Sequence, residues 1–137
     1  MATLPDTDRS LVLRTDFSDP SAWSELRRLM ELPSEDGFRA QLSFVDDPDL
    51  RDLSLDQLMA LVRGSMYRTF FFVADHRALA DPEHAVLVVD TNEQSGRTFR
   101  VVPSEAWSVE NNLSLSNMDF SEFADNADAD GVFRGFR

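Results

Sequence analysis

The chain has 137 residues, 42% of them apolar and 28% charged, which predicts one globular domain with a hydrophobic core and excludes a disordered chain. With 25 acidic and 13 basic residues its formal net charge is -12, so neither nucleic acid nor an anionic membrane surface is an expected partner. The absence of cysteine excludes disulfides, thiolate nucleophiles and cysteine-bound metal centres.

The first half of the chain alternates predicted strands with predicted helices. Residues 1–9 are polar and predict a flexible lead-in, while residues 10–137 make up the predicted domain. Apolar segments predict strands over residues 10–16, 38–45 and 68–75. Because helices separate these strands, we expect them to run parallel in one sheet.

Helix-start signals precede both predicted helices of this half. Asp19 and Pro20 fit the N-cap and the first helical position, and this helix is expected to end at Leu32. Ser54 and Gln57 have the spacing of a capping box, and an apolar helical face follows them.

The second half begins with a predicted hairpin. Its two strands are expected over residues 85–90 and 97–102, with a polar turn between them. The predicted fold class is therefore α/β: a single domain with a mixed sheet that is parallel in its first half (β-α-β-α-β), followed by a C-terminal hairpin and a short third helix.

The last third of the chain has weaker patterns. The Asn- and Ser-rich residues 107–117 predict an irregular segment with Leu113 and Leu115 turned inward. Residues 119–126 predict the short third helix, and residues 131–136 predict an edge strand or a docked tail.

Four stretches of the sequence point to a known family: SLVLRTDFSDPSAW, GFRAQLSFVDDP, HAVLVVDTNEQSGRTFRVVP and SVENNLSLSNMDFSEFADNADADGVFRGF. Together they cover almost the whole chain, and NNLSLSNMDF and DGVFRGF are the most distinctive. The sequence resembles a family of short bacterial proteins, mostly actinobacterial, that carry a domain of unknown function. The resemblance implies a bacterial cytoplasmic protein with a self-contained domain, and it assigns no activity.

Motifs that would indicate an enzyme or a membrane protein are missing from the sequence. No apolar run is long enough to span a bilayer, and the N-terminus lacks a signal-peptide pattern, so we expect a cytoplasmic protein. There is no Gly-x-Ser-x-Gly nucleophile motif and no Gly-rich phosphate loop. These gaps weigh against an enzyme, and no cofactor is expected.

Aspartates follow the apolar strands predicted in the first half. They are Asp16, Asp46, Asp47 and Asp75. If the strands are parallel, these carboxylates share one edge of the sheet and could bind Mg²⁺ or Mn²⁺. The competing interpretation is that aspartate favours turns and helix starts, because its side chain accepts hydrogen bonds from nearby backbone N–H groups. Asp90 also follows a strand, but an antiparallel fourth strand would place it at the opposite edge.

Aromatic, amide and arginine side chains near the C-terminus are candidate partner-binding residues. They are Trp107, Asn111, Asn112, Phe133, Arg134 and Phe136. Aromatic residues and arginine are enriched at interface hot spots. Two structural alternatives remain: the tail docks on its own sheet, or the asparagines serve local geometry, with Asn117 capping the helix that begins near residue 119.

Three functions compete at this point. The favoured hypothesis is a cytoplasmic protein-binding module whose acidic surface recognises a basic protein partner. The second is a divalent-metal-dependent hydrolase or metal-binding protein that uses the strand-end aspartates. The third is a structural subunit of an assembly.

Overall fold

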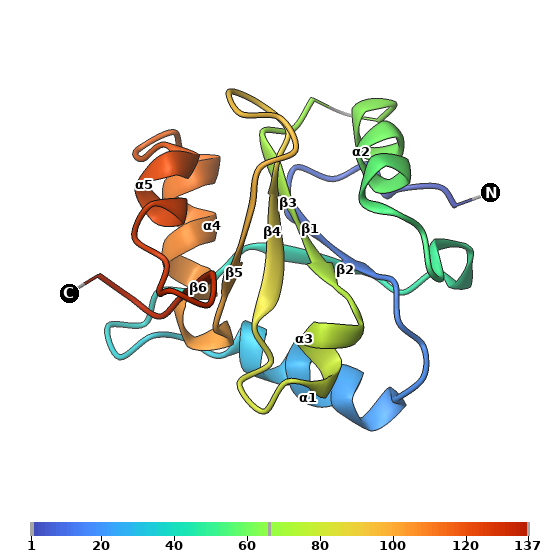
Figure 1. Cartoon of the computed structure of the whole chain (residues 1–137), viewed down its shortest axis with the longest axis horizontal. Helices are drawn as coiled ribbons and strands as arrows, with labels where there is room; N and C mark the ends of the chain where they lie inside the picture. The colour runs from blue at the N-terminus through green and yellow to red at the C-terminus, as the bar shows by residue number, and fades with distance from the viewer. Residues whose placement is uncertain (1, 66, 137) are drawn as a thin grey trace.

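The computed structural model describes residues 2–65 and 67–136, so Met1 of the predicted lead-in and Arg137 of the predicted domain lie outside it. Within these residues six strands form one sheet, in the order β2-β1-β3-β4-β5-β6 (Figure 1). The strands are β1 (Ser10–Arg14), β2 (Leu42–Val45), β3 (Phe70–Ala74), β4 (Val86–Asp90), β5 (Thr98–Val101) and β6 (Val132–Phe133). Strand β1 pairs in parallel with β2 and β3, whereas β4 is antiparallel to β3 and β5. The predicted mixed α/β sheet with a parallel first half is confirmed.

Helices cover both faces of the sheet. They are α1 (Pro20–Glu31), α2 (Leu55–Arg63), α3 (His76–Ala80), α4 (Ala106–Ser114) and α5 (Phe120–Ala124), with 3-10 turns at η1 (Pro48–Leu50) and η2 (Pro103–Glu105). Residues of α1, α3, α4 and α5 share one hydrophobic cluster with the sheet, and residues of α2 share a second cluster. Figure 1 shows α4 and α5 on the opposite side of the strands from α2.

Strand β3 is apolar at every position because both of its faces are buried. Phe70 and Phe72 belong to the larger cluster, whereas Phe71 and Val73 belong to the cluster under α2. Successive side chains of a strand point to opposite faces, so a strand covered on both sides needs no polar positions. The N-terminal segment joins the second cluster through the buried Ala2, although residues 2–9 form no helix or strand.

The predicted helix starts are both present. Asp19 accepts a hydrogen bond from the backbone N–H of Ala22 (3.0 Å). Ser54 accepts one from Gln57 N–H (3.2 Å), and the Gln57 side chain accepts from Ser54 N–H (2.8 Å), which completes the capping box of α2.

This cap gives a first test of the fold. Replacing Ser54 with alanine leaves the N–H of Gln57 without its acceptor, so we expect the free energy of unfolding to fall by about 1 kcal/mol. Urea denaturation followed by circular dichroism measures it. Ser54→Asp restores a capping oxygen and should recover most of the loss; an alanine variant as stable as the parent would show that the cap contributes nothing.

Two sequence predictions in the second half are wrong. The Asn- and Ser-rich segment is not irregular, because most of it forms α4, where Val109 and Leu113 lie four residues apart and face the core. Leu115, predicted to turn inward, is 69% exposed just beyond this helix. Asn117 does not cap α5: the N-cap is Asp119, whose own N–H donates to the Glu122 carboxylate (2.8 Å).

One strand boundary and one additional helix in the first half also differ from the sequence prediction. Strand β2 is limited to Leu42–Val45, because the preceding residues leave the sheet: Phe38 stacks on Trp107, and Gln41 N–H donates to the Glu110 carboxylate (2.7 Å). Helix α3 follows β3 directly and is not among the helices predicted from the sequence. Its N-cap is Asp75, which accepts from Ala78 N–H (3.0 Å).

Candidate functional site

The aspartates that follow the parallel strands lie at one edge of the sheet. Strands β1, β2 and β3 run in the same direction, so Asp16, Asp46 and Asp75 all come after carboxyl ends. Strand β4 runs the other way, and Asp90 therefore ends at the opposite edge. The topology predicted for these residues is correct.

Two of these aspartates form ion pairs with arginines of the sheet. Asp75 makes a bidentate pair with the buried Arg100, with Nη–Oδ distances of 2.9 and 2.6 Å. Asp46 accepts from Arg14 Nη1 at 3.0 Å. Both arginines belong to strands and lie almost entirely inside the protein, so the carboxylates neutralise charges that the sheet itself buries.

Asp16 forms a pair that the sequence did not indicate. Its Oδ2 lies 2.6 Å from Nδ1 of His76, whose side chain is 81% exposed. The side-chain hydrogen bond from Ser18 lowers the pKa of Asp16, and the backbone N–H of Ser18 and the contact with His76 act in the same direction, against a smaller effect of burial. Asp16 is therefore a well-stabilised carboxylate that holds an exposed imidazole.

Asp47, the neighbour of Asp46 after β2, caps a turn. Its Oδ1 accepts from Asp49 N–H (2.9 Å) and caps η1. Within residues 2–65 and 67–136 no group of three or more histidine, aspartate or glutamate side chains is placed to hold a metal ion. Asp47 and Asp75 each accept a hydrogen bond from a nearby backbone N–H, as the structural interpretation predicts, whereas Asp46 pairs with Arg14.

The predicted binding residues of the C-terminal tail are largely used within the protein. Phe133 is fully buried in β6, so its ring is not available to a partner. Arg134 donates to the carboxylates of Glu83, Asp128 and Asp130, with shortest distances of 2.7 Å to each. The side-chain hydrogen bond to Arg134 is the main cause of the lowered pKa of both Glu83 and Asp130. Of this tail, Phe136 keeps about half of its surface exposed.

The predicted asparagines make contacts with the scaffold. Asn111 Nδ2 donates to the carbonyl of Arg39 (2.9 Å) and to the Glu110 carboxylate (3.1 Å). Asn112 Nδ2 donates to the carbonyl of Ser108 (2.8 Å), one turn earlier in α4. Their amides thus bond to the loop before β2 and to their own helix.

Trp107 lies beside an open groove formed by segments that are distant in the sequence. The Trp107 groove has a volume of about 490 Å³ and is lined by Leu29, Leu32, Pro33, Ser34, Glu35, Asp36, Ser104, Glu105 and Trp107. Phe38 stacks on the Trp107 ring, with centroids 5.4 Å apart and an interplanar angle of 14°. Phe38 is 52% and Leu32 49% exposed, so apolar and aromatic surface faces solvent here.

The charge of the Trp107 groove is entirely negative among the described residues that line it. Glu35, Asp36 and Glu105 contribute carboxylates, and no basic residue lines it. Burial raises the pKa of Glu105, because desolvation disfavours its charged form. Within residues 2–65 and 67–136 no hydrogen bond or ion pair satisfies the Glu105 carboxylate, although Gly135 of the tail lies so close that a Cβ there would meet its Oε1 at 3.1 Å.

Comparison with family models relates nearly the whole structure to other proteins. Residues 9–136 match the domain of unknown function DUF6924, a span that runs from the start of β1 past β6. The chain belongs to the DUF6924 family. The resemblance noted in the sequence is thereby confirmed as membership of an uncharacterised family. A search of curated proteins found no relative of this DUF6924 chain.

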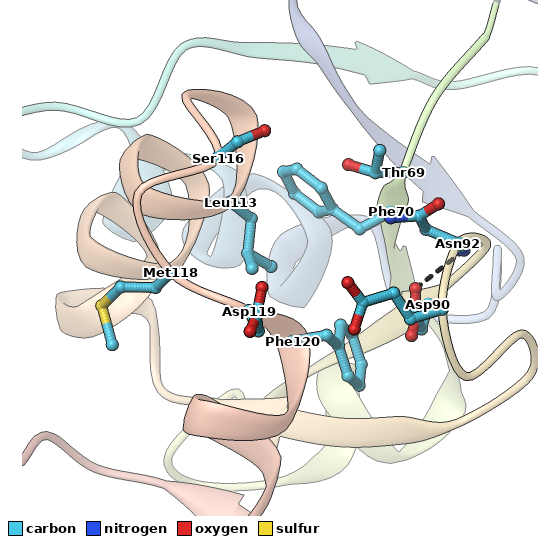
Figure 2. Close-up of a pocket in the computed structure, with 10 residues that line it drawn as sticks. Thr69, Phe70, Asp90, Asn92, Leu113, Ser116, Met118, Asp119 and Phe120 are labelled. Carbon is cyan, nitrogen blue, oxygen red and sulfur yellow. Dashed lines mark hydrogen bonds between the residues drawn. The ribbon is translucent and has the colours of Figure 1, made fainter.

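A second hollow of the DUF6924 domain lies where the loop between α4 and α5 meets the β4 end of the sheet. It has a volume of about 150 Å³ and is lined by Thr69, Phe70, Asp90, Asn92, Glu93, Leu113, Ser116, Met118, Asp119 and Phe120 (Figure 2). Its buried acid, Asp90, accepts from the backbone N–H groups of Asn92 (2.8 Å) and Gln94 (2.9 Å). This carboxylate therefore fixes the hairpin turn.

No helix in the described part of the DUF6924 chain has the length and apolar character needed to cross a membrane.

Proposed function

We propose that this DUF6924 protein is a cytoplasmic protein-binding module that recognises a basic segment of a partner protein through the Trp107 groove. The observation that carries the proposal is the Phe38–Trp107 stack, in which the Phe38 ring is half exposed, beside three carboxylates that have no basic residue among them. A partner side chain that is both cationic and able to lie on an aromatic face fits this surface, which makes arginine the best match.

Each part of the groove contributes a different interaction. The aromatic stack and Leu32 supply apolar area that loses water on binding, as interface hot spots do. Glu105 supplies a half-buried carboxylate, which interacts more strongly with a cation than an exposed one because fewer waters screen it. The overall charge of -12 attracts a basic partner from a distance and speeds its association.

The proposal predicts selective and salt-sensitive binding of arginine-containing peptides. We expect a labelled peptide selected from an array of short basic sequences to bind the protein. Phe38→Ala should lower the affinity for this peptide about tenfold, because an aromatic hot-spot contact is lost. Fluorescence anisotropy gives the affinities and stopped flow the rates. The association rate should fall steeply as salt rises, while dissociation changes less, because exposed charges are screened over about 8 Å at physiological salt.

Matched variants separate the groove from the general surface charge. Glu105→Gln keeps the shape of the side chain but removes its charge. It should lower the affinity for the peptide in the same way as Phe38→Ala. Tyr67→Ala removes an aromatic ring that is 85% exposed and does not line the groove, and it should leave binding unchanged. Equal affinities for all three variants, or association rates that do not respond to salt, would refute the proposal.

A further inference from the structure

Strand β2 lies at the edge of the sheet with an open side. Within residues 2–65 and 67–136 its one neighbour in the sheet is β1, and the two strands pair in parallel with Ser10 opposite Leu42. The carbonyl of Gln41 accepts from Ser10 N–H (2.9 Å). Alternate residues of a parallel strand bond to the same neighbour, so this register turns the backbone groups of Leu42 and Phe44 towards the open side.

A groove with a positive charge runs along this open side. The β2 edge groove has a volume of about 530 Å³ and is lined by Arg9, Arg27, Glu31, Arg39, Ala40, Gln41, Leu42, Ser43 and Phe44. Three arginines and one glutamate give it an excess of positive charge in a protein whose net charge is -12. A cluster of arginines at one strand edge of an acidic protein favours a negatively charged ligand at that edge.

The arginines are available in different degrees. Arg27 lies over the Phe44 ring, 4.7 Å from its centroid, and bonds weakly to Glu31 (3.4 Å). The guanidinium groups of the exposed Arg9 and Arg39 make no ion pair or hydrogen bond with the described residues. Two free cations and one that is fixed on an aromatic ring therefore border the open backbone groups.

We propose that an extended, acidic segment of a partner protein binds here by adding a strand to β2. Its main chain bonds to the backbone groups of Leu42 and Phe44, and its carboxylates pair with Arg9 and Arg39. A second copy of this chain is a poorer occupant, because two β2 edges side by side would bring their arginines together, and like charges across strands are destabilising. This inference does not depend on the Trp107 groove, which is acidic and calls for a ligand of the opposite charge.

The test uses a labelled peptide of about eight residues in which glutamate alternates with valine, long enough for one strand. We expect the peptide to bind the full chain. The double variant Arg9→Glu/Arg39→Glu should lower the affinity for the peptide at least tenfold. Arg28→Glu changes an exposed arginine of α1 that does not line the groove, and this control should have little effect. NMR of the labelled protein should show the largest amide shifts at Leu42 and Phe44.

Further probes define the outcomes that overturn the inference. The same peptide with N-methylated backbone amides should lose affinity, because it keeps the charge but cannot form a strand ladder. If both peptides bind equally, the site recognises charge alone, and the arginines merely protect an open edge. Sedimentation that shows dimers through β2 would make a second copy the occupant. Phe38→Ala should leave this peptide unaffected, so failure here is distinguishable from failure at the Trp107 groove.

Discussion

Replacing Asp75 with alanine should lower the free energy of unfolding by about 3 kcal/mol, because it leaves Arg100 buried without its counter-ion. Arg100 is 9% exposed, and without Asp75 its side chain would keep the hydrogen bond to the carbonyl of Ala85 (3.0 Å). The substitution also removes the N-cap of α3, which adds to the loss. The expected result is a large destabilisation at a residue that the sequence presents as a candidate metal ligand.

Urea denaturation of three variants measures this effect. Asp75→Asn keeps an oxygen for the cap of α3 but loses the charge, so it should fall between the parent and Asp75→Ala. Asp46→Ala should cost about 1 kcal/mol or less, because Asp46 is 44% exposed and Arg14 keeps its bond to the carbonyl of Asp16. If Asp75→Ala proved as mild as Asp46→Ala, the Arg100 pair would not stabilise the fold.

The second large effect is expected at Phe123. Its ring is fully buried and contacts three other aromatic rings, with centroid distances of 6.2 Å to Phe99, 5.2 Å to Phe133 and 5.5 Å to Phe136. Removing it leaves a cavity that the rigid sheet cannot close, so Phe123→Ala should cost about 3–5 kcal/mol.

Thermal and urea unfolding of Phe123→Ala give the size of this loss. Phe123→Leu fills most of the cavity and should recover a large part of the stability. Tyr67→Ala deletes a ring that is exposed to solvent and should unfold like the parent. A Phe123→Ala protein with unchanged unfolding would mean that α5 does not depend on this packing.

Local signals were sufficient to predict the first half of the fold. Asp19 and Ser54 cap their helices with side chains a few residues away, so the hydrogen bonds that start α1 and α2 can be read from the sequence. The unbroken apolar run at Phe70–Ala74 indicates a strand covered on both faces. Such contacts are short in sequence, and the parallel topology follows from the helices between the strands.

Helix α4 could not be predicted in this way, because packing against the sheet stabilises it. Asparagine and serine have modest helix propensity, and they dominate the composition of the segment. Val109 and Leu113 gain their burial only once the sheet is formed. Helix α3 is a single short turn of His76–Ala80, too brief for a periodic pattern.

The position of the strand-end aspartates at one sheet edge was predicted from the sequence, but the arginines that pair with them were not. Arg14 and Arg100 lie within apolar strand segments, and a buried arginine needs a carboxylate. That pattern could have indicated the ion pairs of Asp46 and Asp75. The Trp107 groove gave no comparable signal, because its lining residues Leu32 and Glu105 come from separate segments without regular spacing.

The short strand β6 protects the sheet against aggregation through its edge. Its two residues cover the outer edge of β5, where Arg100 N–H donates to the carbonyl of Gly131 (2.9 Å) and Val102 N–H to that of Phe133 (3.3 Å). A chain cut before Gly131 would present Thr98–Val101 as an uncovered edge, and the buried ring of Phe123 would lose its contacts with Phe133 and Phe136. Uncovered strand edges pair with other chains and lead to aggregates. The tail thus protects the outer edge of β5, and we expect a chain truncated before Gly131 to aggregate.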